Sequence, residues 1–199
     1  LKNGNIGVCA NLFKKVEFDP FKEAPDPENI SHRIFLNAYY NAMFNYERSF
    51  PYIDMYHAIQ FEKYKEPVMI GYFRPMINKL KASGVKMNIF DMLKDEEDTI
   101  PMDQQGEYLS RSDLVVISAT TVFNKTFLDI ISKTPDKCSI YILGPSTLMM
   151  EFMLEYRNVR GIFGSTFSQN DKRVLKVIKN NGGTQDFSTY MNKVVLTEE

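Results

Sequence analysis

The chain has 199 residues, of which 44% are hydrophobic and 13% aromatic, and its 24 Lys and Arg nearly balance its 25 Asp and Glu. This composition is typical of a globular protein and argues against intrinsic disorder. The two signs of charge are interspersed, which argues against a nucleic-acid surface or a basic membrane patch. No apolar run approaches the roughly 20 residues of a membrane span, so we expect neither nucleic acid nor a membrane as a partner.

The two cysteines, Cys9 and Cys138, are far apart in the sequence and have no partners at metal-ligand spacing. This pattern argues against a disulfide framework and is typical of a reducing compartment, so we expect a cytoplasmic protein. Because the chain opens at Leu1 rather than at Met, we also expect that residues ahead of it are missing.

The N-terminal part predicts a short apolar strand over residues 5–12 and a helix over residues 31–47. Along one side of this helix lie Asn37, Asn41 and Asn45, each four residues from the next. Asn is a poor residue for a helix interior, so three in register need an explanation. They form either a solvated stripe or a row of amides that faces a ligand, and Asn37 and Asn41 lie nearest the apolar face of the helix.

From about residue 67 the sequence alternates short apolar strands with helical segments. The predicted strands span residues 68–71, 85–90, 113–119, 140–143, 161–164 and 191–196, and the predicted helices span residues 75–83, 125–134, 148–156 and 172–180. This alternation predicts an α/β fold, a Rossmann-like doubly wound parallel sheet with right-handed crossovers. Residues 93–107 are too polar for another full strand and helix, so we expect a shortened crossover and the strand order 2-1-3-4-5.

Ligands of doubly wound sheets bind where the strand order reverses, here between the carboxyl ends of the first and third strands. The polar turns 71–75 and 119–124 would meet there, with the turn 144–147 one strand further along. A helix starting after 144–147 would add backbone N–H groups and two hydroxyls suited to an anion. The ligand contacts expected from these turns are Gly71, Phe73, Arg74, Thr120, Thr121, Asn124, Gly144, Pro145, Ser146 and Thr147.

Two charged residues bear on the class of ligand. Arg74 precedes a helix and is either a bidentate contact to a carboxylate or phosphate, or an ordinary surface residue. Asp91 ends the second strand 20 residues after Gly71, close to where a Rossmann fold binds ribose. The turn 71–75 has one glycine where the dinucleotide fingerprint has three, which disfavours dinucleotide binding.

No catalytic residue can be assigned from the sequence. There is no G-x-S-x-G motif, and His32 and His57 are not paired with a nucleophile. The sequence also lacks H-x-x-x-H, C-x-x-C and clustered carboxylates, so a preformed soft-metal site is not readable. The weak candidates for metal ligation are His57, Asp54 and Asp91.

Several longer segments resemble a known family. These are SDLVVISATTVFNKTFLDIISK, YILGPST and GIFGSTF, which resemble the C-terminal domain of the putative heavy-metal chelation family, a domain of unknown function. The segments FLNAYYNA and VMIGYFRPMINKL are similar to its N-terminal helix and its first Rossmann-like strand. The family usually has more sequence ahead of Ile6, so the resemblance implies a partial N-terminal domain.

The resemblance implies two domains, a small truncated α+β domain similar to the enolase N-terminal domain over residues 1–52 and a Rossmann-like domain over residues 53–199. It places the site at their interface. Carried onto matching positions, the implied site residues are Asn37, Asn41, Gly71, Thr120, Thr121, Asn124, Gly144, Pro145 and Ser146.

These observations lead to one hypothesis and two alternatives. The leading hypothesis is a cytoplasmic protein that binds a small anionic molecule, a heavy metal or a metal chelate in an interdomain cleft, with a divalent metal or a chelate as the expected cofactor. The first alternative is an enzyme that binds a nucleotide or an S-adenosylmethionine-type cofactor in the same cleft. The second is an interaction module with a vestigial cleft. Whether a reaction is catalysed is open, and a homodimer is compatible with the sequence.

Overall fold

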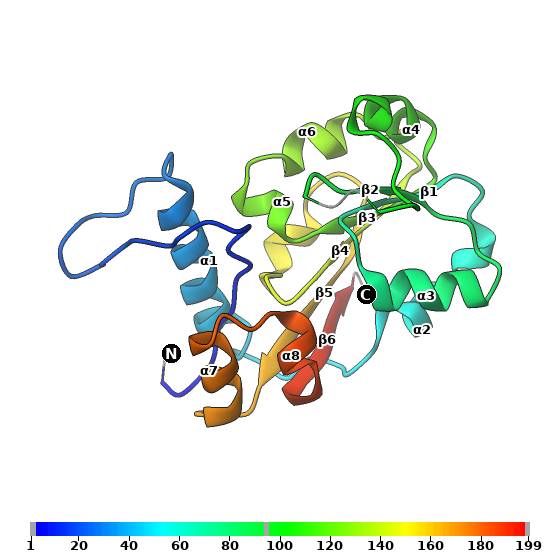
Figure 1. Cartoon of the computed structure of the whole chain (residues 1–199). Helices are drawn as coiled ribbons and strands as arrows, with labels where there is room; N and C mark the ends of the chain where they lie inside the picture. Colours follow the sequence, from blue (N-terminus) through cyan, green and yellow to red (C-terminus); the bar gives the residue numbers. More distant parts are fainter. Residues whose placement is uncertain (1–2, 94–95, 198–199) are drawn as a thin grey trace.

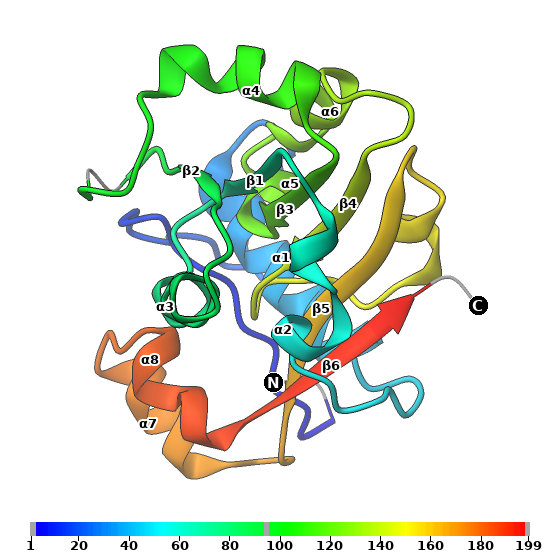
Figure 2. The same cartoon turned by 90° about the vertical axis from the view of Figure 1, so that its right-hand side faces the viewer.

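The computed structural model describes residues 3–93 and 96–197, and its centre is a six-stranded sheet in the order β2-β1-β3-β4-β5-β6. Strands β1 to β5 are parallel, and β6 is antiparallel to β5. Figures 1 and 2 show this sheet from two directions. The strands are β1 (Pro67–Ile70), β2 (Asn88–Phe90), β3 (Leu114–Ser118), β4 (Ser139–Leu143), β5 (Val159–Phe167) and β6 (Met191–Thr197). The predicted order 2-1-3-4-5 and the last edge strand are confirmed.

Helices cover both faces of the sheet, as a doubly wound fold requires (Figure 2). The α-helices are α1 (Ile30–Phe44), α2 (Met55–Ala58), α3 (Arg74–Ala82), α4 (Gln105–Arg111), α5 (Thr120–Phe123), α6 (Phe127–Ser132), α7 (Lys172–Lys179) and α8 (Thr184–Phe187). Four 3-10 turns complete the described elements, η1 (Phe61–Lys63), η2 (Met102–Gln104), η3 (Glu151–Leu154) and η4 (Ser188–Tyr190).

Strand β3 lies at the centre because its apolar run has no polar face. Val115 and Ile117 pack into the core beneath α4 and α6, and Leu114 and Val116 pack into the core beneath α2 and α3. All four side chains are completely buried. Burial on both faces is what a continuous apolar run predicts for a central parallel strand.

The connection from β2 to β3 explains the reversal of strand order. It crosses over β1, and the described part of it contains η2 and the seven-residue helix α4 and no other helix or strand. Thr99 forms a short parallel bridge with Ile89, so the connection also covers part of the outer edge of β2. The expectation of a shortened crossover is therefore confirmed.

Two predicted helices differ from the structure. The helix predicted over residues 125–134 is shorter in the structure, because Lys125 has a positive φ of 68° and α6 begins only at Phe127 and ends at Ser132. The helix predicted over residues 148–156 is wrong, since only the 3-10 turn η3 forms there. The backbone of the loop after β4 is bound by side chains of α1, as described below, and cannot enter a helical hydrogen-bond ladder.

The strand predicted over residues 5–12 is also wrong. Residues 6–11 lie outside the sheet and cross α1, where a Cβ on Gly7 would lie 1.9 Å from the carbonyl oxygen of Ala38. The backbone of this segment is hydrogen-bonded by side chains and not by a neighbouring strand. For example, the Tyr46 hydroxyl donates to the Ile6 carbonyl at 2.8 Å. Figure 1 shows this segment and α1 at the end of the sheet where the parallel strands finish.

Helix α7 begins at a charged N-cap. The buried carboxylate of Asp171 accepts the backbone N–H of Arg173 at 2.9 Å and a guanidinium N–H of the same residue at 2.7 Å. These bonds from Arg173 lower the pKa of Asp171 to about 2. The cap joins α7 to the small core that contains Val174, Phe187 and Ile6.

Gly7→Ala tests the close crossing of residues 6–11 over α1. A methyl group has no space against a helix backbone, so we expect the free energy of unfolding to fall by about 1–3 kcal/mol. Gly106→Ala is the matched control, because nothing lies within 4 Å of its Cβ position and alanine favours helix α4. Urea unfolding of both variants checks this, and equal stability of the two would contradict the crossing.

Asp171→Ala tests the N-cap through its pH dependence. A carboxyl whose pKa is lowered in the folded state stabilises the fold above its unfolded pKa of roughly 4. This contribution is lost as the pH falls toward 2. We therefore expect the variant to be less stable than the parent at pH 7 and the difference to shrink between pH 4 and pH 2. Asp129→Ala, which removes an exposed i,i+4 pair with Lys133, should show a much smaller difference across the same range.

Candidate functional site

The carboxyl ends of β1, β3 and β4 meet at two glycines with positive φ. Gly71 has a φ of 108°, and a Cβ there would lie 2.9 Å from the Cβ of Ser118. Gly144 has a φ of 137°, and a Cβ there would lie 3.8 Å from the Cβ of Ala119. The ring of Phe73 lies against both positions, 3.3 Å from the first and 3.9 Å from the second. We call the surface formed by Gly71, Phe73, Ser118, Thr120 and Gly144 the edge site.

Two hydroxyls form the polar part of the edge site. The Oγ of Ser118 and the Oγ1 of Thr120 lie 2.9 Å apart, and both residues are half-buried. Two other predicted contacts serve the backbone, since Thr121 donates to the carbonyl of Ser118 at 2.8 Å and Asn124 accepts the N–H of Thr126 at 3.0 Å. Ser118 was missed from the sequence, because it ends an apolar strand and resembles no motif.

The three asparagines of α1 are buried and bind backbone. Asn37 donates to the carbonyl of Ser146 at 2.9 Å, and Asn41 donates to the carbonyls of Val8 at 2.9 Å and Pro145 at 3.4 Å. Their exposed fractions are 8% and 2%, and that of Asn45 is 1%. The interpretation as a solvated stripe is therefore wrong. We call these three side chains the asparagine ladder.

Asn45 holds the loop after β4 most firmly. Its Nδ2 donates to the carbonyl of Thr147 at 2.9 Å, and its Oδ1 accepts the backbone N–H of Met149 at 2.9 Å. An α-helix over residues 148–156 would use the carbonyl of Thr147 for its first bond. Asn45 binds this carbonyl and the N–H of Met149, and it holds both in the geometry of an irregular loop.

The hydroxyls of the 144–147 turn are also bonded inside the protein. Ser146 Oγ accepts the backbone N–H of Ala10 at 3.0 Å, and Thr147 Oγ1 donates to the carbonyl of Phe163 at 2.9 Å. Both residues are buried. The structure thus places Pro145, Ser146 and Thr147 beside Asn37 and Asn41, as residues that join α1 to the sheet.

A cysteine lies in the same cluster. The Cys9 thiol donates to the carbonyl of Ala10 at 3.6 Å, and burial raises the pKa of Cys9 to about 12. The thiol is therefore neutral near pH 7. An isolated cysteine in an irregular segment gave no signal in the sequence, since only the crossing over α1 brings it here.

The predicted charged contacts lie on the β1–β2 side and have partners. The carboxylate of Asp91 is half-buried and accepts the backbone N–H groups of Tyr72 and Leu93, each at 2.7 Å. The guanidinium of Arg74 pairs with Glu96 at 2.7 Å and lies over the Tyr72 ring at 5.2 Å from its centroid. These bonds fix the turn between β1 and α3.

The candidate metal ligands are not gathered together. Asp54 caps α2 and pairs with Lys79 at 3.5 Å and with Lys193, while the exposed His57 contacts the ring of Tyr56 edge-on. Across residues 3–93 and 96–197, no three His, Cys, Asp or Glu side chains form a group that could hold a metal ion. Asp54 already pairs with two lysines, and within the described ranges neither Asp54 nor Asp91 belongs to such a group, so these carboxylates do not fit a resident heavy-metal ion.

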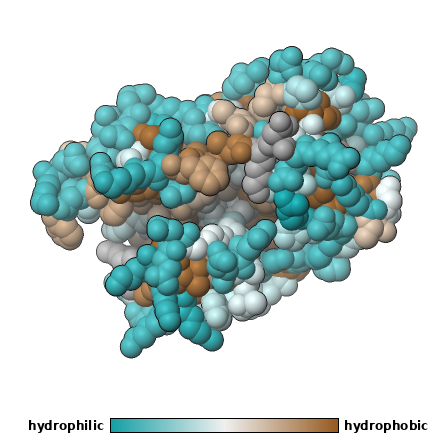
Figure 3. Space-filling view, in the orientation of Figure 1, coloured by the Kyte–Doolittle hydropathy of each residue, from teal (hydrophilic) through white to brown (hydrophobic). Residues whose placement is uncertain are grey.

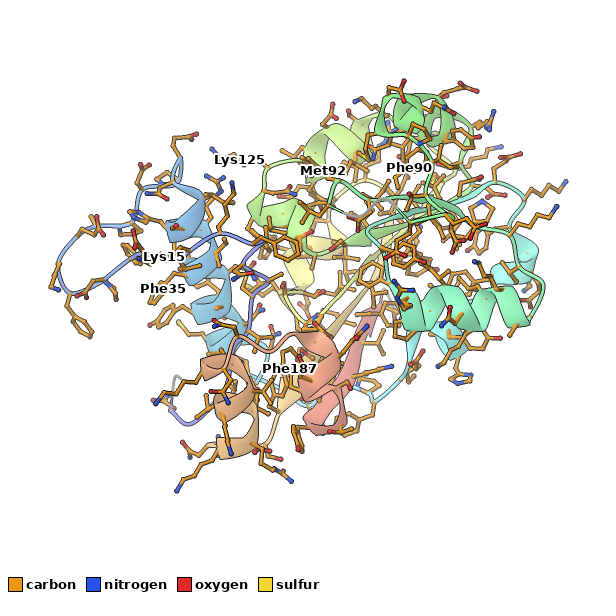
Figure 4. All side chains as sticks on the ribbon, in the orientation of Figure 1. Lys15, Phe35, Phe90, Met92, Lys125 and Phe187 are labelled. Carbon is orange, nitrogen blue, oxygen red and sulfur yellow. The ribbon has the colours of Figure 1, made fainter. Side chains whose placement is uncertain are left out.

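The molecular surface is hollowed where the parallel strands end. Figure 3 shows this hollow between the part of the molecule that contains α5 and the part that contains α7 and α8. The side chains around it come from segments distant in sequence, as Figure 4 shows for Lys125 above and Phe187 below. None of the helices described is long and apolar enough to cross a membrane.

Asn45→Ala tests the asparagine ladder. It leaves the Met149 N–H and the Thr147 carbonyl buried without partners, so we expect the free energy of unfolding to fall by about 2–4 kcal/mol. Asn78→Ala, at an exposed position of α3, should change it by less than about 0.5 kcal/mol. Chemical unfolding measures both, and a small effect of the Asn45 change would show that the ladder does not hold the loop.

Comparison with known proteins identifies the family. The sequence pattern of the DUF364 family, described as "Putative heavy-metal chelation", matches residues 54–197. A comparison with curated proteins found no match. The resemblance inferred from the sequence is therefore confirmed.

Two solved structures share the fold. A DUF364 protein of unknown function from Pyrococcus horikoshii is 22% identical, with a TM-score of 0.77 over 94% of this chain and 78% of that chain. A DUF364 protein of unknown function from Desulfitobacterium hafniense DCB-2 is 20% identical, with a TM-score of 0.66 over 84% of this chain and 67% of that chain. At this identity the likeness shows the fold alone. The match over residues 54–197 shows that the chain belongs to the DUF364 family, described as "Putative heavy-metal chelation".

Proposed function

We propose that this chain binds a small anionic molecule or a metal chelate at the edge site. The observation that supports it most is the half-buried hydroxyl pair of Ser118 and Thr120, placed between two positive-φ glycines where the strand order reverses. This is the position at which doubly wound sheets bind ligands. A metal would arrive within its chelate, since residues 3–93 and 96–197 hold no group of three His, Cys, Asp or Glu side chains that could bind it directly.

The hydroxyl pair leaves one proton for a ligand. Ser118 Oγ accepts the backbone N–H of Thr120 at 3.3 Å and can donate to Thr120 Oγ1. The Thr120 O–H is then available to an acceptor such as a carboxylate or chelate oxygen. Phe73 provides an apolar surface beside it for the body of the ligand.

We further propose a division of the chain at residue 52 and a cytoplasmic location. The family pattern begins at residue 54, which supports a Rossmann-like unit that starts near this point. Cys9 and Cys138 are both free thiols, which suits a reducing compartment.

Thr120→Val tests the proposed ligand contact with little change of shape. We would measure melting temperatures with nickel citrate, ferric citrate, citrate alone and each metal salt alone. We expect a rise with a chelate or with citrate, because a ligand that binds only the folded state stabilises it. The variant should bind about tenfold more weakly, which corresponds to roughly 1.4 kcal/mol for one lost hydrogen bond.

The control is Thr189→Val, at an exposed position of η4. It should keep the full response to the chelate. An equal rise in melting temperature for Thr120→Val and the parent would exclude the edge site as the binding place. A response to metal salts alone, unaffected by Thr120→Val, would instead indicate a metal site elsewhere on the chain.

A further inference from the structure

A second hollow at the carboxyl end of β2 is not used by the edge site. Its volume is about 480 Å³, and it is lined by Asp91, Met92, Leu93, Thr99, Ile100, Pro101 and Met102. Met92 is 68% exposed and Leu93 is 53% exposed, which leaves large apolar side chains at its rim. Figure 4 shows Met92 beside the carboxyl end of β2.

Another hollow of similar size lies at the opposite end of β2. That one is lined by residues of α3 and of the segment before β2, including Leu80, Val85 and Met87. It lies at the amino end of the strand. Because doubly wound sheets bind ligands at the carboxyl ends, the hollow beside Asp91 is the candidate.

The Asp91 carboxylate offers two acceptor positions of fixed geometry. Each of its oxygens accepts one backbone N–H, from Tyr72 or from Leu93, at 2.7 Å. A carboxylate oxygen has two lone pairs, so each retains one position for a further donor. Two adjacent acceptor positions on a carboxylate held by the backbone suit two neighbouring hydroxyls, such as the diol of a ribose.

The place where a phosphate would bind is filled by the protein. The Phe73 ring lies against Gly71 and Gly144, which would otherwise let a diphosphate approach the backbone. The Tyr72 N–H already donates to Asp91, and Pro75 in the first turn of α3 has no N–H to donate. A diphosphate would have to displace the ring and lie close to a carboxylate.

We infer that the hollow binds the base and ribose of a nucleoside whose 5′ carbon carries no phosphate. The base packs against Met92, Ile100 and Met102, and the ribose diol donates to Asp91. The 5′ substituent points toward the edge site. This inference does not depend on chelate binding, because a different set of residues makes the contacts.

Isothermal titration calorimetry of the full chain tests the ligand class. The probes are adenosine, guanosine, cytidine and uridine, the 2′,3′-dideoxy form of the best binder, and its 5′-diphosphate. We expect at least one nucleoside to bind, with affinity at least tenfold above both the dideoxy form and the diphosphate. Binding of none of the four at millimolar concentration, or equal affinity for the diphosphate, would overturn the inference.

Substitutions at Met92 and Leu128, which are both exposed, locate the binding place without threatening the fold. Met92→Glu should lower nucleoside affinity at least tenfold, whereas Leu128→Glu, at a 60% exposed position of α6, should leave it unchanged. Phe73→Ala should reduce the ratio between the affinity for the nucleoside and the affinity for its diphosphate. An unchanged nucleoside affinity in Met92→Glu, or an unchanged affinity ratio in Phe73→Ala, would contradict the assignment.

Discussion

The asparagine ladder of α1 holds the loop that follows β4, and the shape of the sheet's carboxyl edge depends on it. Its three amides bind the carbonyls of residues 145–147, and Asn45 also accepts the Met149 N–H. Each such bond contributes about 1 kcal/mol, but a buried group left without its partner costs about 1–3 kcal/mol. The loop therefore stays in place because moving it would leave these buried polar groups without hydrogen-bond partners. Ser146 also accepts the Ala10 N–H, which fixes the segment that carries Cys9.

This arrangement makes the two sides of the strand reversal chemically different. On the β1–β2 side, Phe73 covers the glycines, and Arg74 and Asp91 have protein partners. On the β3–β4 side, the hydroxyls of Ser118 and Thr120 are half-buried and neutral. A site of this kind selects a ligand by hydrogen-bond geometry and apolar contact more than by charge. For this reason we propose a chelate or a nucleoside without phosphate, and not a dinucleotide, as the ligand.

The sequence predicted the sheet well because local patterns determine it. The apolar run of β3 and the weak apolar character of residues 93–107 are enough to give the strand order. The two wrong elements, over residues 5–12 and 148–156, fail for one physical reason. Their backbone groups bond to side chains far away in the chain, as Met149 does to Asn45 across 104 residues. A local sequence pattern cannot predict a hydrogen-bond partner that lies so far away in the chain.

Only part of the candidate site could be predicted, because the sequence shows local spacing but not distant partners. The spacing of the asparagines showed that their amides share one side of α1, but an amide that awaits a ligand and one that binds backbone look alike in a sequence. Ser118 and Cys9 were missed because a serine at a strand end and a cysteine in an irregular segment have no motif. Their roles follow from tertiary contacts alone.

Native-state hydrogen exchange at the Met149 amide tests the central role of the ladder most directly. This N–H lies in an irregular segment and is bonded to the Asn45 side chain, whereas the Ile140 N–H is bonded to the Asn158 carbonyl in the sheet. If the ladder fixes the loop, the Met149 amide exchanges as slowly as that of Ile140, through global unfolding. Exchange of Met149 at the rate of an exposed loop, with Ile140 still protected, would contradict it.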